Sequence, residues 1–346
     1  MVFEFFLTKS EKLSRKLSFE TVAFLFNLSP LMRGIVSRIE SKDYYVFTED
    51  KEIRCSLRGK FRLEAEWKKD KLLYTDLVVV GDHIEFTMND DGTGVIEELP
   101  ERKNYLSRKA PLLKGMSEKG KRVEQIIAAN VDYTVCVTST KNPKFNNRVL
   151  DRMIVTAESC KTKPVIVINK IDLEKKKKKH LWHELYSTLG YNVFSCSAET
   201  RKGIEELKDF LKDKVSVFIG HSGVGKSSIL NSFSDKIDQN VEEISEAWDK
   251  GVHTTVTSVL FKINDSTFVI DTPGIREIEP YGITKKDVTH YFKELAYFSR
   301  NCRFSNCTHT HEPECKIKEA VEEGDIFEER YESYLRLIES LDEEEF

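Results

Sequence analysis

The 346-residue sequence has no apolar run long enough to cross a membrane. Its longest nearly apolar stretch near the N-terminus, Thr21–Met32, is too short to span a bilayer, and Asn27, Ser29 and Pro30 interrupt it. A signal peptide would place basic residues before a clean apolar core, whereas this chain has Glu4 near its start and no such core. We therefore expect a cytoplasmic protein that does not contact a membrane.

The sequence also has little net charge and few cysteines. A formal charge of −4 argues against a chain that binds polyanions over its whole surface, although charge can be concentrated in one region. Three of the seven cysteines cluster near the C-terminus, and four lie in apolar or strand-like contexts where a reduced, buried thiol is expected: Cys55, Cys136, Cys160 and Cys196. The length suggests two or three domains, and a hydrophobic content of 40% is sufficient for ordinary cores.

The most informative stretch is VSVFIGHSGVGKSSILN, which begins at Val215. An apolar run, a glycine-rich turn and a helix start match the phosphate-loop pattern G-x-x-x-x-G-K-[ST]. Its backbone N–H groups can converge on phosphate oxygens, and its lysine can reach the β- and γ-phosphates. A plain glycine turn is the alternative, and the ordered Gly-Lys-Ser argues against it. We expect a nucleoside triphosphate to contact Gly220, His221, Ser222, Gly223, Val224, Gly225, Lys226, Ser227 and Ser228.

Two strand ends upstream of this loop predict which base is bound. The run PVIVIN ends in Asn169-Lys170-Ile171-Asp172, where a carboxylate can accept hydrogen bonds from the ring N–H and the exocyclic amine of guanine. Adenine has no such pair of donors, so this site would reject it. The next strand ends in a Ser-Ala turn whose backbone N–H groups could meet the guanine O6. We expect GTP rather than ATP, bound by Asn169, Lys170, Asp172, Ser197 and Ala198.

Two stretches downstream supply the remaining phosphate chemistry. The run FVIDTPG is a strand that ends in D-x-x-G, where Asp271 can bind Mg²⁺ through water and the Gly274 N–H can sense the γ-phosphate. The stretch KGVHTT is typical of a mobile loop with hydroxyls for the metal. Either Thr254 or Thr255 could be the ligand, and Thr255 is slightly favoured because a strand-like run follows it. We expect Mg²⁺ to be held by Ser227, Thr255 and Asp271.

Hydrolysis at such a site requires water to attack the γ-phosphate in line. Lys226 and the loop N–H groups would stabilise the charge of the transition state. Many GTPases orient the water with a glutamine directly after the D-x-x-G glycine, but this chain has Ile275 there. We predict slow intrinsic turnover that a partner accelerates, with His253 as the water-orienting residue; the alternative is that His253 only fixes its loop. The expected catalytic residues are Lys226, His253 and Thr255.

The regions before this site have a different character. From Arg33, short alternating runs separated by Gly, Asn and Asp indicate a small antiparallel barrel of about five strands, a form that suits an OB-type barrel used on RNA. Residues 101–124 contain eight basic and three acidic residues without a clear period. We expect a linker there, either solvated or neutralising RNA phosphates. The runs VDYTVCVTS and PVIVINK then predict strands buried on both faces of a parallel sheet.

A group of potential metal ligands follows the GTPase motifs. Cys302, Cys307, His309 and Cys315 supply three thiols and an imidazole within fourteen residues, which satisfies the ligand count of a closed tetrahedral zinc site. His311 is a competing imidazole that spacing alone does not exclude. Four protein ligands leave no open position, so we expect a structural rather than a catalytic zinc. Helical spacing is present before and after this group, at Thr284–Phe298 and at Ile326–Leu341.

The order of these motifs is a circular permutation of the usual GTPase order, because N-K-I-D and S-A precede the phosphate loop. Together with LRGKFR, EQIIAANVD, VLDR, GHSGVGKSSILN and CRFSNCTHTHEPEC, it resembles the ribosome small subunit-dependent GTPase A family, also called RsgA or YjeQ, from about Arg33 to about Ala320. His221 departs from the family, which more often has glutamine there. The resemblance places zinc on His309. It implies a GTPase that binds the small ribosomal subunit and its rRNA late in maturation and leaves after hydrolysis.

We therefore expect a multidomain, monomeric protein that uses Mg²⁺ with GTP and holds one structural Zn²⁺. The alternative is a nucleotide-gated RNA-binding module in which hydrolysis is incidental. The expected order is an N-terminal extension (1–32), an OB-type β-barrel (33–100), a basic linker (101–124), a central α/β circularly permuted P-loop GTPase domain (125–283) and a mainly helical zinc-binding module with an acidic C-terminal helix (284–346).

Overall fold

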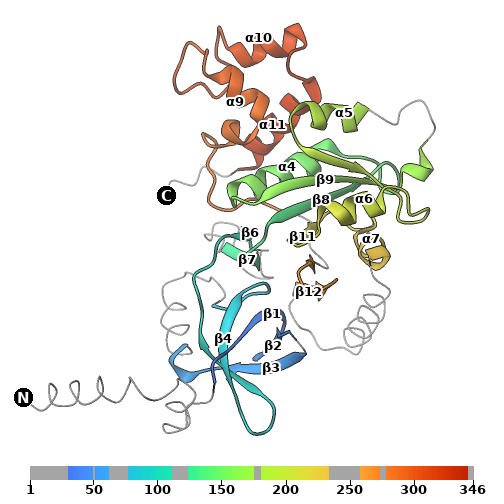
Figure 1. The fold of residues 1–346 in the computed structure, drawn as a ribbon. Helices are drawn as coiled ribbons and strands as arrows, with labels where there is room; N and C mark the ends of the chain where they lie inside the picture. Colours follow the sequence, from blue (N-terminus) through green and yellow to red (C-terminus); the bar gives the residue numbers. More distant parts are fainter. Residues whose placement is uncertain are drawn as a thin grey trace, which may run out of the picture.

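The computed structural model shows three parts in a row, with the N-terminal barrel on one side of a central sheet and a group of C-terminal helices on the other (Figure 1). It describes residues 30–49, 51–61, 77–110, 124–174, 181–233, 258–272 and 278–341. Among these described residues, no helix has both the length and the apolar character needed to cross a membrane.

The N-terminal part is a closed five-stranded barrel with the strand order β1-β2-β3-β5-β4, which confirms the predicted barrel. Side chains alternate between inside and outside, as in β3, where Ile53 and Cys55 are buried and Arg54 between them is exposed. Val36, Phe86 and Ile96 complete the same core. The strands are β1 (Met32–Glu40), β2 (Asp43–Phe47), β3 (Glu52–Leu57), β4 (His83–Met88) and β5 (Gly94–Glu98).

A two-stranded ribbon connects the barrel to the sheet. Its strands β6 (Tyr105–Lys109) and β7 (Glu124–Ala129) pair in antiparallel fashion. The sequence favours a linker over residues 101–124, but residues Tyr105–Lys109 of that stretch form strand β6. The physical reason is Leu106, whose fully buried side chain joins the core of the central domain despite the basic residues around it.

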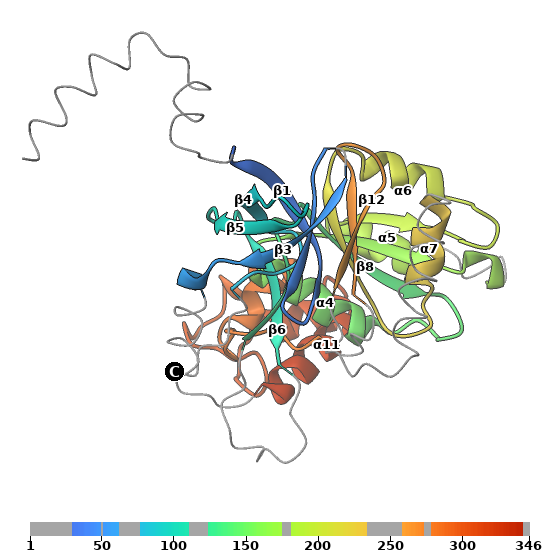
Figure 2. The same cartoon turned by 90° about the horizontal axis from the view of Figure 1, so that it is seen from below.

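The central sheet has six strands in the order β10-β9-β8-β11-β13-β12, all parallel except the edge strand β12. Its inner strands are continuous apolar runs, as expected for a sheet covered on both faces. Figure 2 shows β12 beside strand β1 of the barrel, where Lys262 Nζ donates a hydrogen bond to Glu49 O at 3.3 Å. The strands are β8 (Tyr133–Ser139), β9 (Lys163–Asn169), β10 (Asn192–Ser195), β11 (Val215–Ile219), β12 (Val259–Lys262) and β13 (Phe268–Asp271).

Two helices cover each face of this sheet. One apolar cluster contains residues of α4 and α5, such as Leu150 and Leu185, and the other contains residues of α6 and α7, such as Leu207 and Ile229. The helices are α4 (Asn147–Ser159), the short 3-10 helix η1 (Ile171–Leu173), α5 (Leu181–Thr188), α6 (Ile204–Phe210) and α7 (Lys226–Phe233).

The C-terminal helices pack against α4. The expected helix over Thr284–Phe298 is interrupted, because Phe292 adopts an extended backbone and its buried ring meets the ring of Tyr334 edge-on. The longest of these helices, α11, lies along α4 (Figure 1). The elements are the 3-10 helix η2 (Val288–Tyr291), α9 (Lys293–Ser299), α10 (Lys316–Glu323) and α11 (Glu328–Ser340).

Candidate functional site

Those predicted nucleotide residues that the structure describes lie at one edge of the central sheet. Strands β9, β10, β11 and β13 are parallel, so their carboxyl ends lie at the same edge. The phosphate loop follows β11, the Asn-Lys-Ile-Asp turn follows β9, and the Ser-Ala turn follows β10. Ligands of open α/β sheets bind at this edge.

Asn169 holds two of these loops together. Its side chain is almost fully buried, with Nδ2 donating to Val224 O at 2.9 Å and Oδ1 accepting from the Ala198 N–H at 3.2 Å. Gly225 has a φ of +93°, and a Cβ there would lie 2.4 Å from Asn169 Nδ2. Only glycine fits so close to the asparagine. Asn169 therefore braces the phosphate loop against the Ser-Ala turn.

Lys170 forms a second link between loops. Its backbone is left-handed, with φ at +61°, and its Nζ donates to Gly223 O at 2.6 Å and to Asn142 O. In the phosphate loop itself, Lys226 Nζ donates to Gly220 O at 2.7 Å. Both ammonium groups thus lie at backbone carbonyls of the phosphate loop.

A cavity of about 320 Å³ lies beside these loops, within the size range of small-molecule sites. The exposed Asp172 carboxylate lines it, and its Oδ1 accepts a hydrogen bond from the buried Ser197 hydroxyl at 2.6 Å. Ser197 therefore orients the carboxylate that was predicted to read guanine. The lining residues are Asn142, Asn169, Lys170, Asp172, Leu173, Ala198, Glu199, Gly225 and Ser228.

Three lining residues were absent from the sequence prediction. Leu173 and Glu199 directly follow predicted motif residues, so their proximity in sequence could have indicated them. Asn142 comes from the loop after β8, which carries no motif, and only the position of β8 beside β9 brings it to the cavity.

The side chains of Lys226 and Asp271 are both largely buried, and they lie close enough for the charge of each to affect the pKa of the other. Burial lowers the pKa of Lys226, and the charge of Asp271 partly offsets this effect. Burial likewise raises the pKa of Asp271, and Lys226 and the Thr272 N–H oppose that rise. The Thr272 hydroxyl donates to Phe218 O at 2.7 Å, which fixes the end of β13 against β11. Ser227 and Asp271 offer the hydroxyl and carboxylate oxygens that Mg²⁺ prefers.

His253, Thr254, Thr255, Gly274 and Ile275 lie outside the described residues. Their assignments therefore stay predictions.

The four predicted zinc ligands come together in the C-terminal part. One ligand atom from each of Cys302, Cys307, His309 and Cys315 lies within 4.8 Å of the others. His309 Nδ1 is 3.6 Å from Cys302 Sγ and 3.5 Å from Cys315 Sγ. These distances match the separation of about 3.5–3.6 Å that tetrahedral zinc imposes on its nitrogen and sulfur ligands. His311 is exposed, and its Nδ1 faces the Thr310 hydroxyl at 2.9 Å instead. The Cys₃His cluster is compatible with zinc.

The electrostatics of this cluster also fit a cation. Burial and the neighbouring thiols raise the pKa of Cys307 to about 12, so adjacent thiolates would need a positive charge between them. Burial lowers the pKa of His309 and favours the neutral imidazole that binds metals. Helix α11 supports the cluster through hydrogen bonds from the Tyr331 hydroxyl to His309 O at 2.6 Å and from the Tyr334 hydroxyl to Thr308 O at 2.8 Å.

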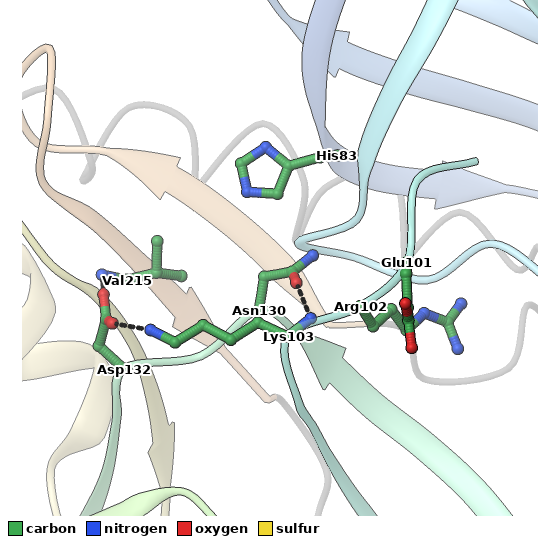
Figure 3. Close-up of a pocket in the computed structure, with 7 residues that line it drawn as sticks. All are labelled: His83, Glu101, Arg102, Lys103, Asn130, Asp132 and Val215. Atoms are coloured by element: carbon green, nitrogen blue, oxygen red, sulfur yellow. Dashed lines mark hydrogen bonds and ion pairs between the residues drawn. The ribbon is translucent and has the colours of Figure 1, made fainter. Parts of the chain in front are cut away.

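A second cavity, of about 570 Å³, lies at the opposite edge of the sheet, where the barrel meets the central domain (Figure 3). Lys103 Nζ forms an ion pair with Asp132 at 2.9 Å across its floor, and the Lys103 N–H donates to Asn130 Oδ1. Asp132 also accepts from the Val215 N–H at 3.0 Å. These polar groups serve the junction between the two domains and lie away from the nucleotide loops.

Comparison with known proteins decides the family. The model of the RsgA GTPase matches residues 99–280, and the model of the RsgA N-terminal domain matches residues 33–96. The chain belongs to the RsgA GTPase family. This family is a family of GTP hydrolases, and its chain order accounts for the base-reading motifs that precede the phosphate loop here.

Curated relatives agree with the assignment to this family. A protein of Chlorobaculum parvum named small ribosomal subunit biogenesis GTPase RsgA is 41% identical over 321 residues, which cover 91% of this chain and 100% of the relative. Its namesake from Thermotoga maritima is 39% identical over 313 residues, which cover 88% and 95%.

Two solved structures have the same fold. The crystal structure of YjeQ from Thermotoga maritima matches with a TM-score of 0.69 and 37% identity over 90% of this chain and 99% of that one. YloQ, described as a circularly permuted GTPase, matches with a TM-score of 0.65 and 29% identity over 90% and 94%.

Proposed function

We propose that this RsgA-family GTPase hydrolyses GTP at the carboxyl edge of its central sheet and acts in the cytoplasm, as a monomer, in biogenesis of the small ribosomal subunit. The observation that carries the proposal is Asn169, whose side chain joins the phosphate loop to the Ser-Ala turn beside the Asp172 cavity. The names of the curated relatives support the ribosomal role. They also disfavour the alternative in which hydrolysis is incidental.

The proposed reaction is attack of water on the γ-phosphorus with cleavage of its bond to the oxygen that bridges to the β-phosphate, giving GDP and phosphate. Asp172, oriented by Ser197, would accept the guanine N–H groups and so select the base. Lys226 would exchange its bond to Gly220 O for the phosphate oxygens. Mg²⁺, held by Ser227, Asp271 and Thr255, would neutralise charge on the β- and γ-phosphates.

The remaining assignments complete this proposal. His253 would orient the attacking water, since Ile275 cannot, and the Gly274 N–H would contact the γ-phosphate. Further contacts to GTP or GDP are proposed for Asn169, Lys170, Ala198, Gly220, His221, Ser222, Gly223, Val224, Gly225, Ser228 and Thr254. We further propose that the barrel (33–100) and the C-terminal module (284–346) contact rRNA.

The test of the proposed function is GTP turnover with and without purified small ribosomal subunits. We expect slow turnover alone and a large rise on addition of subunits, and a flat rate would contradict the ribosomal role. Asp172→Asn should lower the affinity for GTP at least about a hundredfold, because the amide cannot accept both guanine hydrogen bonds. His253→Ala should lose the stimulated turnover while keeping its GTP affinity.

We also propose that the cluster of Cys302, Cys307, His309 and Cys315 holds one structural Zn²⁺. The neutral imidazole and the close thiols support this proposal. Metal analysis of purified protein should find about one zinc per chain, and His309→Ala should lose it. His311→Ala is the matched control, and loss of zinc in that variant instead would move the ligand to His311.

A further inference from the structure

The base cavity and the C-terminal module share one helix. Helix α4 starts at Asn147, directly after the loop 140–146 that carries Asn142 to the cavity. Helix α11 of the C-terminal module packs along the same helix. Whatever moves α11 against α4 therefore acts on the loop that lines the Asp172 cavity.

Asn147 joins the two helices at the end nearest the nucleotide. Its Nδ2 donates to Glu329 O at 2.9 Å and to the hydroxyl of Ser333 at 3.0 Å, both on α11. The buried Ser333 hydroxyl in turn donates to Glu329 O at 2.9 Å. The first residue of α4 is thus held to α11 by neutral hydrogen bonds that involve no metal ligand.

The loop before α4 continues the connection to the nucleotide site. The hydroxyl of Ser139, at the end of β8, donates to Pro143 O of the loop at 2.8 Å, and the ring of Phe145 stacks on Trp182 of α5 with centroids 4.5 Å apart. The Thr140 hydroxyl donates to Lys170 O at 2.7 Å. Because Lys170 Nζ bonds both Asn142 O of this loop and Gly223 O, the loop bears directly on the base-reading turn and the phosphate loop.

A buried arginine makes the C-terminal module follow α4 as one body. Arg330 of α11 is 1% exposed and forms ion pairs with Asp151 of α4 and with Glu294 of α9, the latter at 2.6 Å. Its guanidinium also lies 4.5 Å from the ring centre of Phe292. A displacement of the C-terminal module would therefore be transmitted to α4.

We propose that the C-terminal module controls the rate at which guanine nucleotide leaves the site, through α11, Asn147 and the loop 140–146. Asn147 is a positioning residue in this scheme, because it touches no nucleotide and acts through Asn142 and Lys170. The inference rests on the proposed function, since it assigns a regulatory input to the same site. A partner that binds the C-terminal module would then change the rate of nucleotide release by displacing the loop 140–146 beside the base cavity.

The test is the dissociation rate of a fluorescent GDP analogue from the full-length protein in excess unlabelled GDP. Asn147→Asp keeps the shape of the side chain but removes its donor group, and an acidic residue suits the first turn of a helix, so α4 should persist. We expect dissociation at least about fivefold faster, the lower end of typical coupling between sites. Turnover at saturating GTP should stay within about twofold of the unmodified protein.

Arg148→Gln is the matched control, because Arg148 lies next to Asn147 and also contacts α11, but through a half-exposed ion pair with Glu332. It should release the analogue at the unmodified rate. Ser333→Ala removes only one of the two acceptors and should give a smaller acceleration, which also serves if Asn147→Asp folds poorly. Equal rates in the Asn147, Ser333 and Arg148 variants would overturn the inference, as would a matching fall in turnover. If the unmodified protein binds no GDP analogue, the proposed function itself fails.

Discussion

The barrel junction combines hydrogen bonds of backbone groups and neutral amides with an exposed ion pair, whereas the C-terminal junction adds a buried cluster of charges to its neutral hydrogen bonds. The Ala129 N–H donates to Val80 O at 2.9 Å, and the Asn104 side chain bonds both backbone groups of Val131 at 2.8 Å. The C-terminal junction depends instead on Arg330 between two carboxylates. The two modules are thus attached to one GTPase domain by different chemistry.

Neighbouring residues of the barrel junction face opposite domains (Figure 3). Arg102 binds Asp82 of the barrel with two bonds of 2.7 Å, while Lys103 binds Asp132 of the central domain. The Lys103 side chain is 68% exposed, whereas the Arg330 side chain is 1% exposed. Because solvent screens the first and not the second, we expect single side chains to matter little at the barrel and greatly at the C-terminal module.

The largest effect is expected from Arg330→Met, which leaves the carboxylates of Asp151 and Glu294 buried without their partner. The free energy of local opening of α11 should fall by about 3–5 kcal/mol. Hydrogen exchange of the α11 amides measures it. Arg336→Met on the same helix removes only an exposed pair with Glu339 and should change little. Similar exchange in both variants would mean that the junction does not depend on Arg330.

The barrel junction should be broken by a backbone change instead. Gly81 has a φ of +89°, and a Cβ there would lie 2.3 Å from Ala129 O, so Gly81→Ala should cost about 1–3 kcal/mol. Exchange of the β7 amides reports it. Gly92→Ala is the control, since Gly92 has a φ of +83° but no atom within 4 Å of the added Cβ. Equal losses would show that backbone strain, rather than the close approach, is responsible.

A smaller effect is expected from Lys103→Met. Removal of this exposed ion pair should change the stability of the barrel junction by less than about 1 kcal/mol. The difference should shrink further in high salt, because the pair is screened. Urea denaturation at two ionic strengths measures it, and a loss near that of Arg330→Met would remove the contrast between the junctions.

The smallest expected effect is a change in how the stability of the C-terminal module depends on pH. Burial raises the pKa of Glu158 on α4, although Lys293 and Tyr191 partly oppose the rise and Glu294 adds to it. A raised carboxyl pKa means that its stabilising contribution is present at low pH and is lost as pH rises through the folded pKa. Glu158→Gln should therefore weaken the loss of stability that thermal melts show as the pH rises above 4.5, the ordinary pKa of a glutamate. An unchanged dependence would exclude Glu158 as its source.

At the barrel junction, the pH dependence of stability is expected to have the opposite sign. Although burial acts to raise the pKa of Asp132, Lys103 and the Val215 N–H lower it overall. Its contribution should therefore persist to acidic pH and be lost only as pH falls through the folded pKa.

Local signals made much of this molecule predictable. The phosphate loop and the Asn-Lys-Ile-Asp turn each have a chemistry that their own residues specify, and the strands before them are continuous apolar runs. The Cys₃His group was found in the same way. Spacing alone left His309 and His311 open, and the family resemblance chose His309. The structure places His309 beside the three cysteines, while His311 is exposed.

Contacts between distant segments were not predictable. Asn142 reaches the base cavity only because β8 lies beside β9, and Arg330 meets Asp151 across 179 positions of sequence. Strand β6 was hidden because its basic residues resemble a linker, and its pairing depends on the partner strand β7. In each case the deciding neighbour lies outside any local window.

The β6–β7 ribbon has a practical consequence for dividing the protein. A GTPase fragment that starts at Gln125 would lack strand β6 and would expose the apolar surface that Leu106 covers beside Ile127 and Ala128. Such a fragment is expected to aggregate, and its poor behaviour would say nothing about the nucleotide site. A fragment intended for separate expression should therefore begin upstream of Tyr105.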